Sequence, residues 1–507
     1  MEDKRELGNE KAGKVWLVGA GPSDAGLLTL KGFRVLQDAE VVVYDRLVGI
    51  EILSMIPKKA KKIDVGKRPE YHKIPQEEIN RILLTEALEG KRVVRLKGGD
   101  PFMFGRGGEE LELLYENKVP FEVVPGITSA IAVPAYAGIP VTHRDYCSSL
   151  HIITGHTREG ESPDIDFEAA VNIRGTLVFL MGVSAAKGIS EGLIRAGMVP
   201  DMPAAIIERG TTSRQRKLLT TVGQLPYDAE QNHICSPSII VIGEVCSLSA
   251  KFEWVSEMPL FGKRVVVTRP EKLNSVLSVK IRELGGEAVE FPCIRTVSTI
   301  GNFMLDKALE QVGEYRWLVF TSAAGVEAVF DRMLEMKRDI RELHGLKIAV
   351  VGPGTEKALN RKGINADYMP ESFNVAALAS GLAGLAAVNE KVLVLRAREG
   401  SEELSRIFDE QAVHYEDIPV YDTVYESDIN PFSREIILAY DFDYAAFTSA
   451  STVEGFVNAL PNLDFTKITA ICIGEETAKA AERRGMKCIV ADKSTLDGIV
   501  EAIINAH

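Results

Sequence analysis

Two glycines and an aspartate follow a short apolar run in the segment VVRLKGGDPFMFGRGGEEL, which begins at Val93. The apolar run predicts a buried strand that ends at Gly98 and Gly99. Because glycine has no Cβ, the backbone there can lie very close to a ligand. The carboxylate of Asp100 would then lie beside that ligand, where it favours hydroxyl or ammonium groups over a phosphate. The sequence GGDP by itself is also consistent with an ordinary turn between a strand and a helix.

A second glycine loop, VGAGPSD, ends at Asp24 and partly matches the loop that binds dinucleotides. Gly19 follows a predicted strand, and Asp45 ends the next one, where dinucleotide-binding proteins place a ribose-binding acid. Pro22, however, has no N–H group to offer to a pyrophosphate. Asp24 stands where the third glycine is expected, so it either opposes an anion at the helix start or caps the helix. The loop therefore favours a ligand that carries a nucleoside but no diphosphate. The alternative is that the loop binds a nicotinamide dinucleotide and that the protein is a dehydrogenase.

Strands that alternate with helices must position these loops. The predicted strands of the N-terminal half are KVWLVGAG, EVVVYD, KRVVRLKGGD, FEVVPG, SLHIITG, TLVFLMG and PSIIVIGEV. Between the first two, SDAGLLTLKGFRVLQDA predicts a helix with Leu27, Leu28, Val35 and Leu36 on one face. This alternation predicts βαβ units and a mostly parallel sheet, which binds ligands beyond the carboxyl ends of its strands.

The C-terminal half contains an internal repeat. Three segments recur in the same order with an offset of about 120–130 residues: KRVVVTRP as KVLVLRAR, FTSAAGVEAVF as FTSASTVEGFV, and IAVVGPGTEKALNRKGI as ITAICIGEETAKAAERRGM. A duplicated α/β unit predicts two similar lobes that face a cleft. We place the first half at residues 14–250, a linker at 251–261 and the second half at 262–507. Within the second half, lobe one takes about 262–297 and 425–507, and lobe two takes about 298–420, with FPCIRTV and PVYDTVY crossing between them.

Composition restricts the classes of partner and site. The 507 residues predict several domains, and no apolar run approaches the roughly 20 residues of a bilayer span. The polar N-terminus has no signal-peptide pattern, and the six cysteines form no CxxC pair, which fits the cytoplasm. A net charge of −13 argues against nucleic acid as a partner. His143, His151 and His156 lack a supporting carboxylate pattern, so we expect no metal site.

These loops and strands carry a close resemblance to a known family. Residues from about 14 to 250 resemble uroporphyrinogen-III C-methyltransferase through VGAGPSDAGLLTLKG, VVVYDRLV, VGKRPEYHKIPQEEIN, VVRLKGGDPFMFGRGGEEL, VVPGITSAIAVPAYAGIPVTHRDY, TLVFLMG and ERGTT. Residues from about 262 onward resemble uroporphyrinogen-III synthase through the duplicated FTSA and VGPGT-type segments and VYDTVY. The resemblance implies a tetrapyrrole-methylase-type two-lobed α/β domain followed by a duplicated two-lobed parallel α/β synthase domain.

The resemblance also implies an activity and a cofactor. The synthase would close hydroxymethylbilane to uroporphyrinogen III with inversion of the D ring. The methyltransferase would methylate that product at C2 and C7 with S-adenosylmethionine to give precorrin-2, as a homodimer through its own half. By motif match, cofactor contacts fall at Pro22, Gly98, Gly99, Asp100, Met103, Thr128, Ser129, Met181 and Gly210. Ser23, Met103 and Ser129 depart from the commonest pattern, which bears more on donor affinity than on the reaction.

The methyltransferase chemistry needs an acid–base pair and basic groups. The proton acceptor of the family maps to Asp45 and the proton donor to Lys67. After methylation a ring proton must leave, and a carboxylate at a strand end is a suitable base; Asp45 alone could equally be a loop acid, and Lys67 a solvated lysine. The substrate carries eight carboxylates, which Lys67, Arg68, Arg95 and Arg106 could attract.

The synthase half offers few candidate catalysts, and confinement of the substrate is expected to do much of the work. Thr321, Ser322, Thr448 and Ser449 would lie at corresponding strand ends, where they could bind substrate carboxylates or simply cap helices. Tyr421 matches a tyrosine of the family and could assist the leaving hydroxyl.

Residues at equivalent positions of the repeat complete the expected synthase cleft. Arg269 and Arg396 could bind carboxylates, and the expected rim is Gly352, Pro353, Thr355, Gly474 and Thr477. Because no residue is an obvious catalyst, a non-catalytic module that binds a small ligand remains the alternative for this half.

Overall fold

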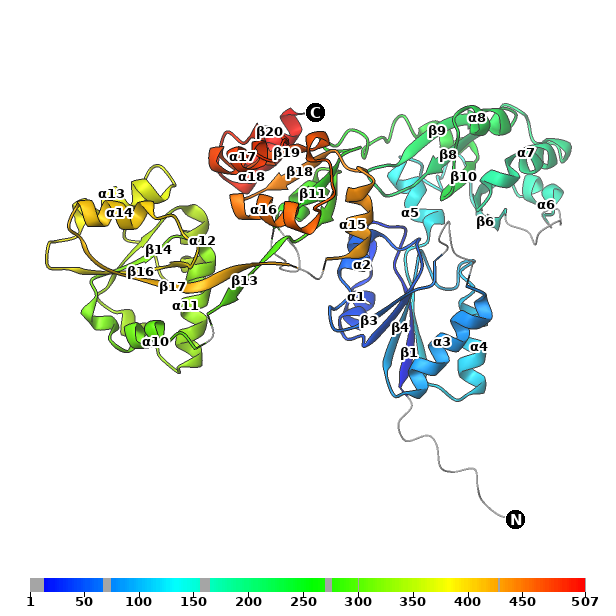
Figure 1. The fold of residues 1–507 in the computed structure, drawn as a ribbon. Helices are drawn as coiled ribbons and strands as arrows, with labels where there is room; N and C mark the ends of the chain where they lie inside the picture. Colours follow the sequence, from blue (N-terminus) through cyan, green and yellow to red (C-terminus); the bar gives the residue numbers. More distant parts are fainter. Residues whose placement is uncertain are drawn as a thin grey trace, which may run out of the picture.

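The described residues fold into four lobes, each built on one five-stranded sheet (Figure 1). The computed structural model describes residues 13–66, 74–155, 165–269, 276–299, 301–426 and 429–506. We call the lobes A, B, C and D in the order in which their first strands occur in the chain. In each lobe the sheet separates two clusters of buried apolar side chains, one on either face. Helices cover these clusters, which gives the expected α/β class.

Lobe A holds both glycine loops. Its strands run in the order β3-β2-β4-β1-β5, and all of them are parallel. Its strands and longer helices are β1 (Lys14–Gly19), α1 (Leu30–Gln37), β2 (Val41–Tyr44), α2 (Ile50–Ser54), β3 (Lys61–Asp64), α3 (Gln76–Leu88), β4 (Arg92–Lys97), α4 (Gly107–Glu116) and β5 (Phe121–Val124). The valine-rich central strands are buried on both faces, as a parallel sheet between helices requires. The first helix begins later than expected, because Thr29 caps α1 and Leu27 and Leu28 precede it.

Lobe B departs from the expected parallel arrangement. Its sheet order is β6-β7-β10-β8-β9, and only β6 and β7 are parallel. Its elements are α5 (Ser129–Tyr136), β6 (Leu150–Thr154), α6 (Phe167–Asn172), β7 (Thr176–Leu180), α7 (Ala186–Arg195), β8 (Pro203–Glu208), β9 (Arg216–Thr221), α8 (Leu225–Gln231) and β10 (Ser238–Ile242). The expectation of mostly parallel pairing is wrong here. The connection between β8 and β9 spans only residues 209–215, too short for a crossover, so β9 folds back antiparallel.

Lobe C contains the two ends of the C-terminal half. Its sheet order is β12-β11-β18-β19-β20, entirely parallel. Its elements are β11 (Arg264–Val267), α9 (Val276–Glu283), β12 (Glu287–Glu290), α15 (Pro431–Leu438), β18 (Tyr444–Phe447), α16 (Ala450–Ala459), β19 (Thr469–Cys472), α17 (Glu475–Glu482), β20 (Lys487–Val490) and α18 (Leu496–Asn505).

Lobe D is inserted between β12 and α15 of lobe C, with sheet order β13-β17-β16-β14-β15. Its elements are β13 (Ile294–Ser298), α10 (Phe303–Glu310), β14 (Trp317–Phe320), α11 (Ala323–Glu335), β15 (Lys347–Val350), α12 (Pro353–Asn360), α13 (Val375–Leu385), β16 (Lys391–Ala397), α14 (Glu403–Glu410) and β17 (His414–Tyr425). Two strands, β13 and β17, pair antiparallel and join lobe D to the rest of the chain (Figure 1). Because β13 bonds to β17, residues 294–297 lie in the sheet of lobe D, whereas the repeat assigns them to lobe one.

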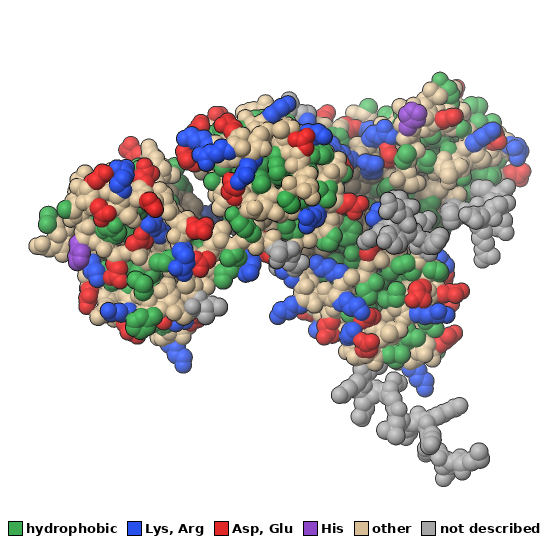
Figure 2. Space-filling view, viewed as in Figure 1, with side chains coloured by type: hydrophobic (Ala, Val, Ile, Leu, Met, Phe, Trp, Pro, Cys, Tyr) green, Lys and Arg blue, Asp and Glu red, His purple; other side chains and the backbone are tan. Residues whose placement is uncertain are grey.

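The sequence repeat corresponds to repeated strand–helix units. The unit β14–α11 of lobe D matches β18–α16 of lobe C, and β15–α12 matches β19–α17. Basic and acidic side chains are interspersed over the face that Figure 2 shows. Among the described residues, no helix has the length and apolar character that a bilayer span requires.

Candidate active sites

The two glycine loops of lobe A form one structure at the carboxyl ends of β1 and β4. The Gly99 N–H donates to the Gly21 carbonyl at 2.8 Å, and the Gly21 N–H donates to the Gly99 carbonyl at 3.1 Å. Gly99 has a φ of +68°, and a Cβ there would meet no atom within 4 Å, so this backbone faces open space. A Cβ on Gly98, in contrast, would lie 2.5 Å from the Cβ of Leu47. One glycine is therefore needed for packing, and the other leaves room for a ligand.

Asp100 fixes the shape of this ligand-facing region. Its Oδ1 accepts hydrogen bonds from the N–H groups of Phe102 (2.8 Å) and Met103 (3.1 Å). Its Oδ2 accepts from the Gly126 N–H at 3.0 Å, in the loop after β5. The carboxylate thus connects two loops at the edge of the sheet, a structural role that the sequence did not indicate.

The remaining expected cofactor residues lie in neighbouring loops of lobes A and B. Thr128 caps α5, which Ser129 begins, and Met103 and Met181 are 37% and 45% exposed. Gly210 packs so tightly against α5 that a Cβ would lie 2.2 Å from a methyl group of Val133. The neighbouring hydroxyl of Thr211 donates to the carbonyl of Pro22. This contact joins the loop of Gly210 to the first glycine loop.

Asp24, in that first loop, caps a short 3-10 helix. Its Oδ1 accepts from the Gly26 N–H at 2.7 Å, and its Oδ2 accepts from the hydroxyl of Tyr136 at 2.6 Å. The structure therefore confirms that Asp24 caps a helix, which is one of the two roles that the sequence allowed.

Asp45 lies directly after β2 in a fixed orientation. Its Oδ1 accepts from the Leu47 N–H at 3.1 Å, and its Oδ2 accepts from Arg95 Nη2 at 3.2 Å. Arg95 and Lys97 are each 4% exposed, and both donate to Glu110 Oε1, at 3.2 and 2.8 Å. Burial, with the charge of Arg95, lowers the pKa of Lys97. The expectation that Arg95 attracts substrate carboxylates is wrong, because its guanidinium is buried between Glu110 and Asp45.

The other expected basic groups differ in accessibility. Lys67 and Arg68 lie outside the described residues. Arg106 is exposed, adopts a φ of +59°, and pairs with Glu109 through Nε at 2.9 Å. This ion pair raises the pKa of Arg106.

The histidines form no metal site in the described part of the chain. His151 lies in β6, with Nε2 at 3.1 Å from the Ser149 hydroxyl, and His143 packs edge-on against Tyr146. His156 lies outside the described residues.

In lobe D, two expected synthase residues are in contact. The hydroxyls of Ser322 and Tyr421 lie 2.9 Å apart, and Tyr421 is 8% exposed. Ser322 also caps α11 by accepting from the Gly325 N–H at 3.1 Å. Thr321, beside Ser322, is half-buried.

The corresponding position of lobe C has the same local structure. Ser449 follows Thr448 and caps α16, where its hydroxyl accepts from the Thr452 N–H at 3.3 Å. The hydroxyl of Ser451 lies 2.8 Å from that of Ser449. Each lobe thus presents a Thr-Ser pair at the start of a helix.

Most of the other expected contacts of the synthase cleft are buried or already paired. Thr355 and Thr477 are each 4% exposed in the first turns of α12 and α17, after Gly352 and Gly474. Arg396 Nε bonds to both oxygens of Asp417, at 3.0 and 2.9 Å, whereas Arg269, after β11, is exposed.

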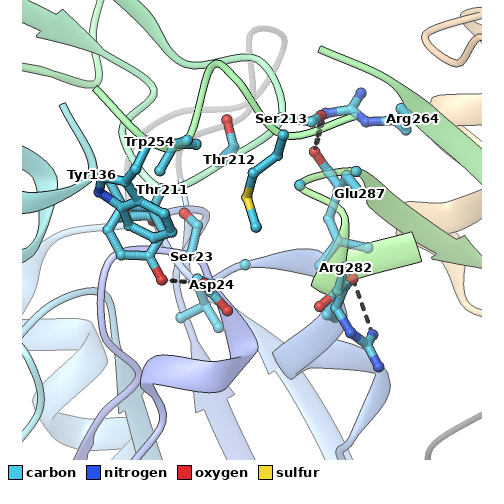
Figure 3. A pocket seen from close by; sticks show the side chains of 18 of the residues that line it. Ser23, Asp24, Tyr136, Thr211, Thr212, Ser213, Trp254, Arg264, Arg282 and Glu287 are labelled. Carbon is cyan, nitrogen blue, oxygen red and sulfur yellow. Dashed lines mark hydrogen bonds and ion pairs between the residues drawn. The ribbon is translucent and has the colours of Figure 1, made fainter. Parts of the chain in front are cut away.

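A cavity of about 280 Å³ lies between lobes A, B and C (Figure 3). Its lining includes Asp24, Tyr136, Ser213, Arg282 and Glu287. Sequence reasoning missed this region, because contacts between lobes leave no periodic pattern. It also missed Glu110, although cations inside the predicted strand VVRLK indicated that a buried carboxylate must be nearby.

Comparisons with known proteins cover both halves of the chain. Residues 14–226 match the family model of tetrapyrrole (corrin/porphyrin) methylases, and residues 275–501 match that of uroporphyrinogen-III synthase HemD. Siroheme synthase 2 of Klebsiella pneumoniae is 53% identical over 247 residues, which are 49% of this chain and 53% of that protein. The crystal structure of uroporphyrin-III C-methyl transferase from Thermus thermophilus complexed with S-adenyl homocysteine is 41% identical, with a TM-score of 0.41, and the match covers 46% of this chain and all of that one.

The match to a further relative extends along nearly the whole chain. The porphyrin biosynthesis protein HemD of Ruminiclostridium josui is 49% identical over 492 residues, which cover 97% of this chain and 98% of that protein. The chain therefore belongs to the family of this HemD protein and joins a tetrapyrrole methylase domain to a uroporphyrinogen-III synthase domain in one bifunctional enzyme of tetrapyrrole biosynthesis.

Proposed function

We propose that lobes C and D convert hydroxymethylbilane to uroporphyrinogen III with inversion of the D ring. Lobes A and B then methylate uroporphyrinogen III at C2 and C7 with S-adenosylmethionine to give precorrin-2. The observation that carries the methyltransferase assignment is the joined pair of glycine loops. The second of these loops follows β4, and β4 pairs with β2, the strand that ends just before Asp45.

The donor site is proposed at the loops of Pro22, Gly98 to Met103, Thr128 and Ser129, Met181 and Gly210. The bound donor supplies an electrophilic methyl group on a positively charged sulfur. Gly99 provides backbone without a side chain, and the exposed Met103 and Met181 provide apolar surface that keeps water away. Asp100 holds two of the loops in place through backbone N–H groups.

Asp45 is proposed as the base of the methyl transfer. After a pyrrole carbon gains the methyl group, its proton must leave, and a carboxylate oxygen can accept it. The hydrogen bonds from the Leu47 N–H and Arg95 orient that carboxylate in advance. By motif match, Lys67 is the proposed proton donor, and Arg68 and Arg106 bind substrate carboxylates.

For the synthase, Tyr421 is proposed to assist departure of the hydroxyl group of hydroxymethylbilane. Its hydroxyl is connected to that of Ser322 at the start of α11. The N-terminus of a helix favours anions, so Thr321, Ser322, Thr448 and Ser449 are suitable contacts for substrate carboxylates. Arg269 and Thr477 are further proposed contacts, although Thr477 is buried.

The proposal also covers the domain bounds, the oligomeric state, the location and the fate of the product. The methyltransferase takes residues 14–250 and the synthase 262–507, with 251–261 as linker. We further propose a homodimer through the methyltransferase half, a cytoplasmic location, and a product that enters sirohaem or cobalamin synthesis.

Each activity has a direct test. Hydroxymethylbilane incubated with the purified chain should give uroporphyrinogen III, whereas uroporphyrinogen I alone would mean spontaneous cyclisation without a synthase. Separately supplied uroporphyrinogen III and S-adenosylmethionine should give a dimethylated product by mass spectrometry, and an unmethylated tetrapyrrole would contradict the methyltransferase assignment.

A further inference from the structure

The connection between β8 and β9, residues 209–215, has one side that faces the proposed donor site. Gly210 packs on α5, and the hydroxyl of Thr211 donates to the carbonyl of Pro22. Gln215 supports this arrangement, because its Oε1 accepts from the Thr211 N–H at 2.9 Å and its Nε2 donates to the Tyr136 carbonyl at 3.0 Å. The position of this connection therefore sets the positions of two proposed donor contacts, Gly210 and Pro22.

The other side of the same connection is bonded to the synthase half. The hydroxyl of Ser213 donates to Glu287 Oε2 at 2.9 Å, in β12 of lobe C. Arg214 Nη1 donates to the Gly262 carbonyl at 2.8 Å, and Nη2 lies 3.2 Å from Asp443 Oδ2. Ser213 is 6% exposed and the side chain of Arg214 27%, so both contacts are largely shielded from water.

Lobe C also contacts lobe A, beside the first glycine loop. Arg282 of α9 pairs with Glu51 of α2, with 3.1 Å between Nη1 and Oε1. Phe432 of α15 packs edge-on against Tyr44 of β2, with ring centroids 5.7 Å apart. Figure 3 shows Ser213 and Glu287 on one side of the cavity and the Tyr136–Asp24 hydrogen bond on the other. Lobe C thus touches both lobes that hold the proposed donor loops.

We propose that lobe C of the synthase positions the donor loops of the methyltransferase, with Arg214 and Ser213 as the positioning residues. The inference rests on the proposed donor site at Pro22 and Gly210. Neither residue touches that site, so each acts through the connection on which it lies. Bonds made from lobe C restrict this connection before the donor binds, which reduces the loss of conformational freedom on binding. By linkage, donor binding must in turn strengthen the contact of lobe C with lobes A and B.

The test compares S-adenosylhomocysteine binding to variants of the full chain by calorimetry. Arg214→Ala should weaken binding about tenfold and raise the KM for S-adenosylmethionine with little change in kcat, because the loop is displaced but the reacting groups are not. Arg214→Lys keeps the positive charge and one donor group. Its affinity for S-adenosylhomocysteine should therefore lie between that of the parent and that of Arg214→Ala. The control is Arg484→Ala, which removes an exposed ion pair with Glu454 inside lobe C and should bind like the parent.

Each outcome is decisive for one claim. If the parent chain binds no S-adenosylhomocysteine, the proposed donor site is wrong, and the positioning role falls with it. If the parent binds and a folded Arg214→Ala binds equally well, only the positioning role is wrong. Circular dichroism and denaturant unfolding of each variant, compared with the parent, report whether all four lobes have folded. Should Arg214→Ala fail to fold, Ser213→Ala decides, with binding about threefold weaker expected and unchanged binding overturning the proposal.

Discussion

Single side chains at the proposed sites are held in place by hydrogen bonds. Asp45 receives hydrogen bonds on both carboxylate oxygens, and Tyr421 lies in hydrogen-bond distance of Ser322. Such fixed orientation is what a proton-transferring group needs, because efficiency falls steeply with misalignment. Both roles can be tested without large changes of shape.

Asp45→Asn keeps the shape of the side chain but removes the proton acceptor. We expect the methylation rate with supplied uroporphyrinogen III to fall by roughly two to four orders of magnitude. Binding of S-adenosylhomocysteine and synthase activity should be unchanged, since Asp45 acts only on the tetrapyrrole proton. A methylation rate within about threefold of the parent would exclude Asp45 as the base.

Tyr421→Phe removes one hydroxyl from lobe D. Formation of uroporphyrinogen III should slow by about tenfold or more, because the leaving hydroxyl loses its proton donor. Methylation of supplied uroporphyrinogen III on the same preparation is the matched control and should be unaffected. An unchanged synthase rate would assign Tyr421 a packing role, in accord with its low exposure.

At the scale of elements, buried ion pairs join β4 to α4. Arg95 and Lys97 of β4 both donate to Glu110 of α4, which is fully buried. Removal of one partner of a buried ion pair leaves an uncompensated charge, which is far more costly than loss of an exposed pair.

Glu110→Ala should therefore destabilise the chain by about 3–5 kcal/mol. The control is Glu109→Ala, which breaks the exposed pair with Arg106 and should cost at most about 1 kcal/mol. Denaturant unfolding of the three proteins measures both values. Equal unfolding midpoints for the two variants would show that the buried network contributes nothing to stability.

The sequence predicted an element correctly where a local run of residues specifies that element. The valine runs of lobe A gave β1, β2 and β4, because strands buried on both faces are apolar throughout. The repeat predicted the paired units β14–α11 and β18–α16. Sequence reasoning missed β3, β8 and β9. The expectation of parallel pairing in lobe B was wrong, because the choice of strand partners depends on non-local contacts. Likewise the motif match named Asp45, but the Arg95 hydrogen bond that orients it required the structure.

At the scale of the whole molecule, lobe C contacts lobes A and B through hydrogen bonds, an ion pair and a ring contact. Glu51 of lobe A is the most perturbed of these. Burial, together with the charges of Glu287 and Asp24, raises the pKa of Glu51 to about 7, against the opposing effect of Arg282. Well below pH 4.5 Glu51 is protonated in both folded and unfolded chains, and well above pH 7 it is ionised in both.

Between these limits the folded chain holds a proton that the unfolded chain has lost. The contribution of Glu51 to stability therefore falls as pH rises from about 4.5 to 7, by on the order of 3 kcal/mol in total. Glu51→Gln should remove this slope, so unfolding midpoints of parent and variant should diverge between pH 5 and pH 8 in favour of the variant. The exposed Glu283→Gln serves as control, and parallel curves for parent and Glu51→Gln would contradict the buried position of Glu51.

The most direct test of the bifunctional assignment is one incubation of the intact chain with hydroxymethylbilane and S-adenosylmethionine labelled with 13C in its methyl group. Mass spectrometry and isomer analysis of the product then report both activities together. The account predicts a type III tetrapyrrole with two labelled methyl groups. An unlabelled type I product would contradict it.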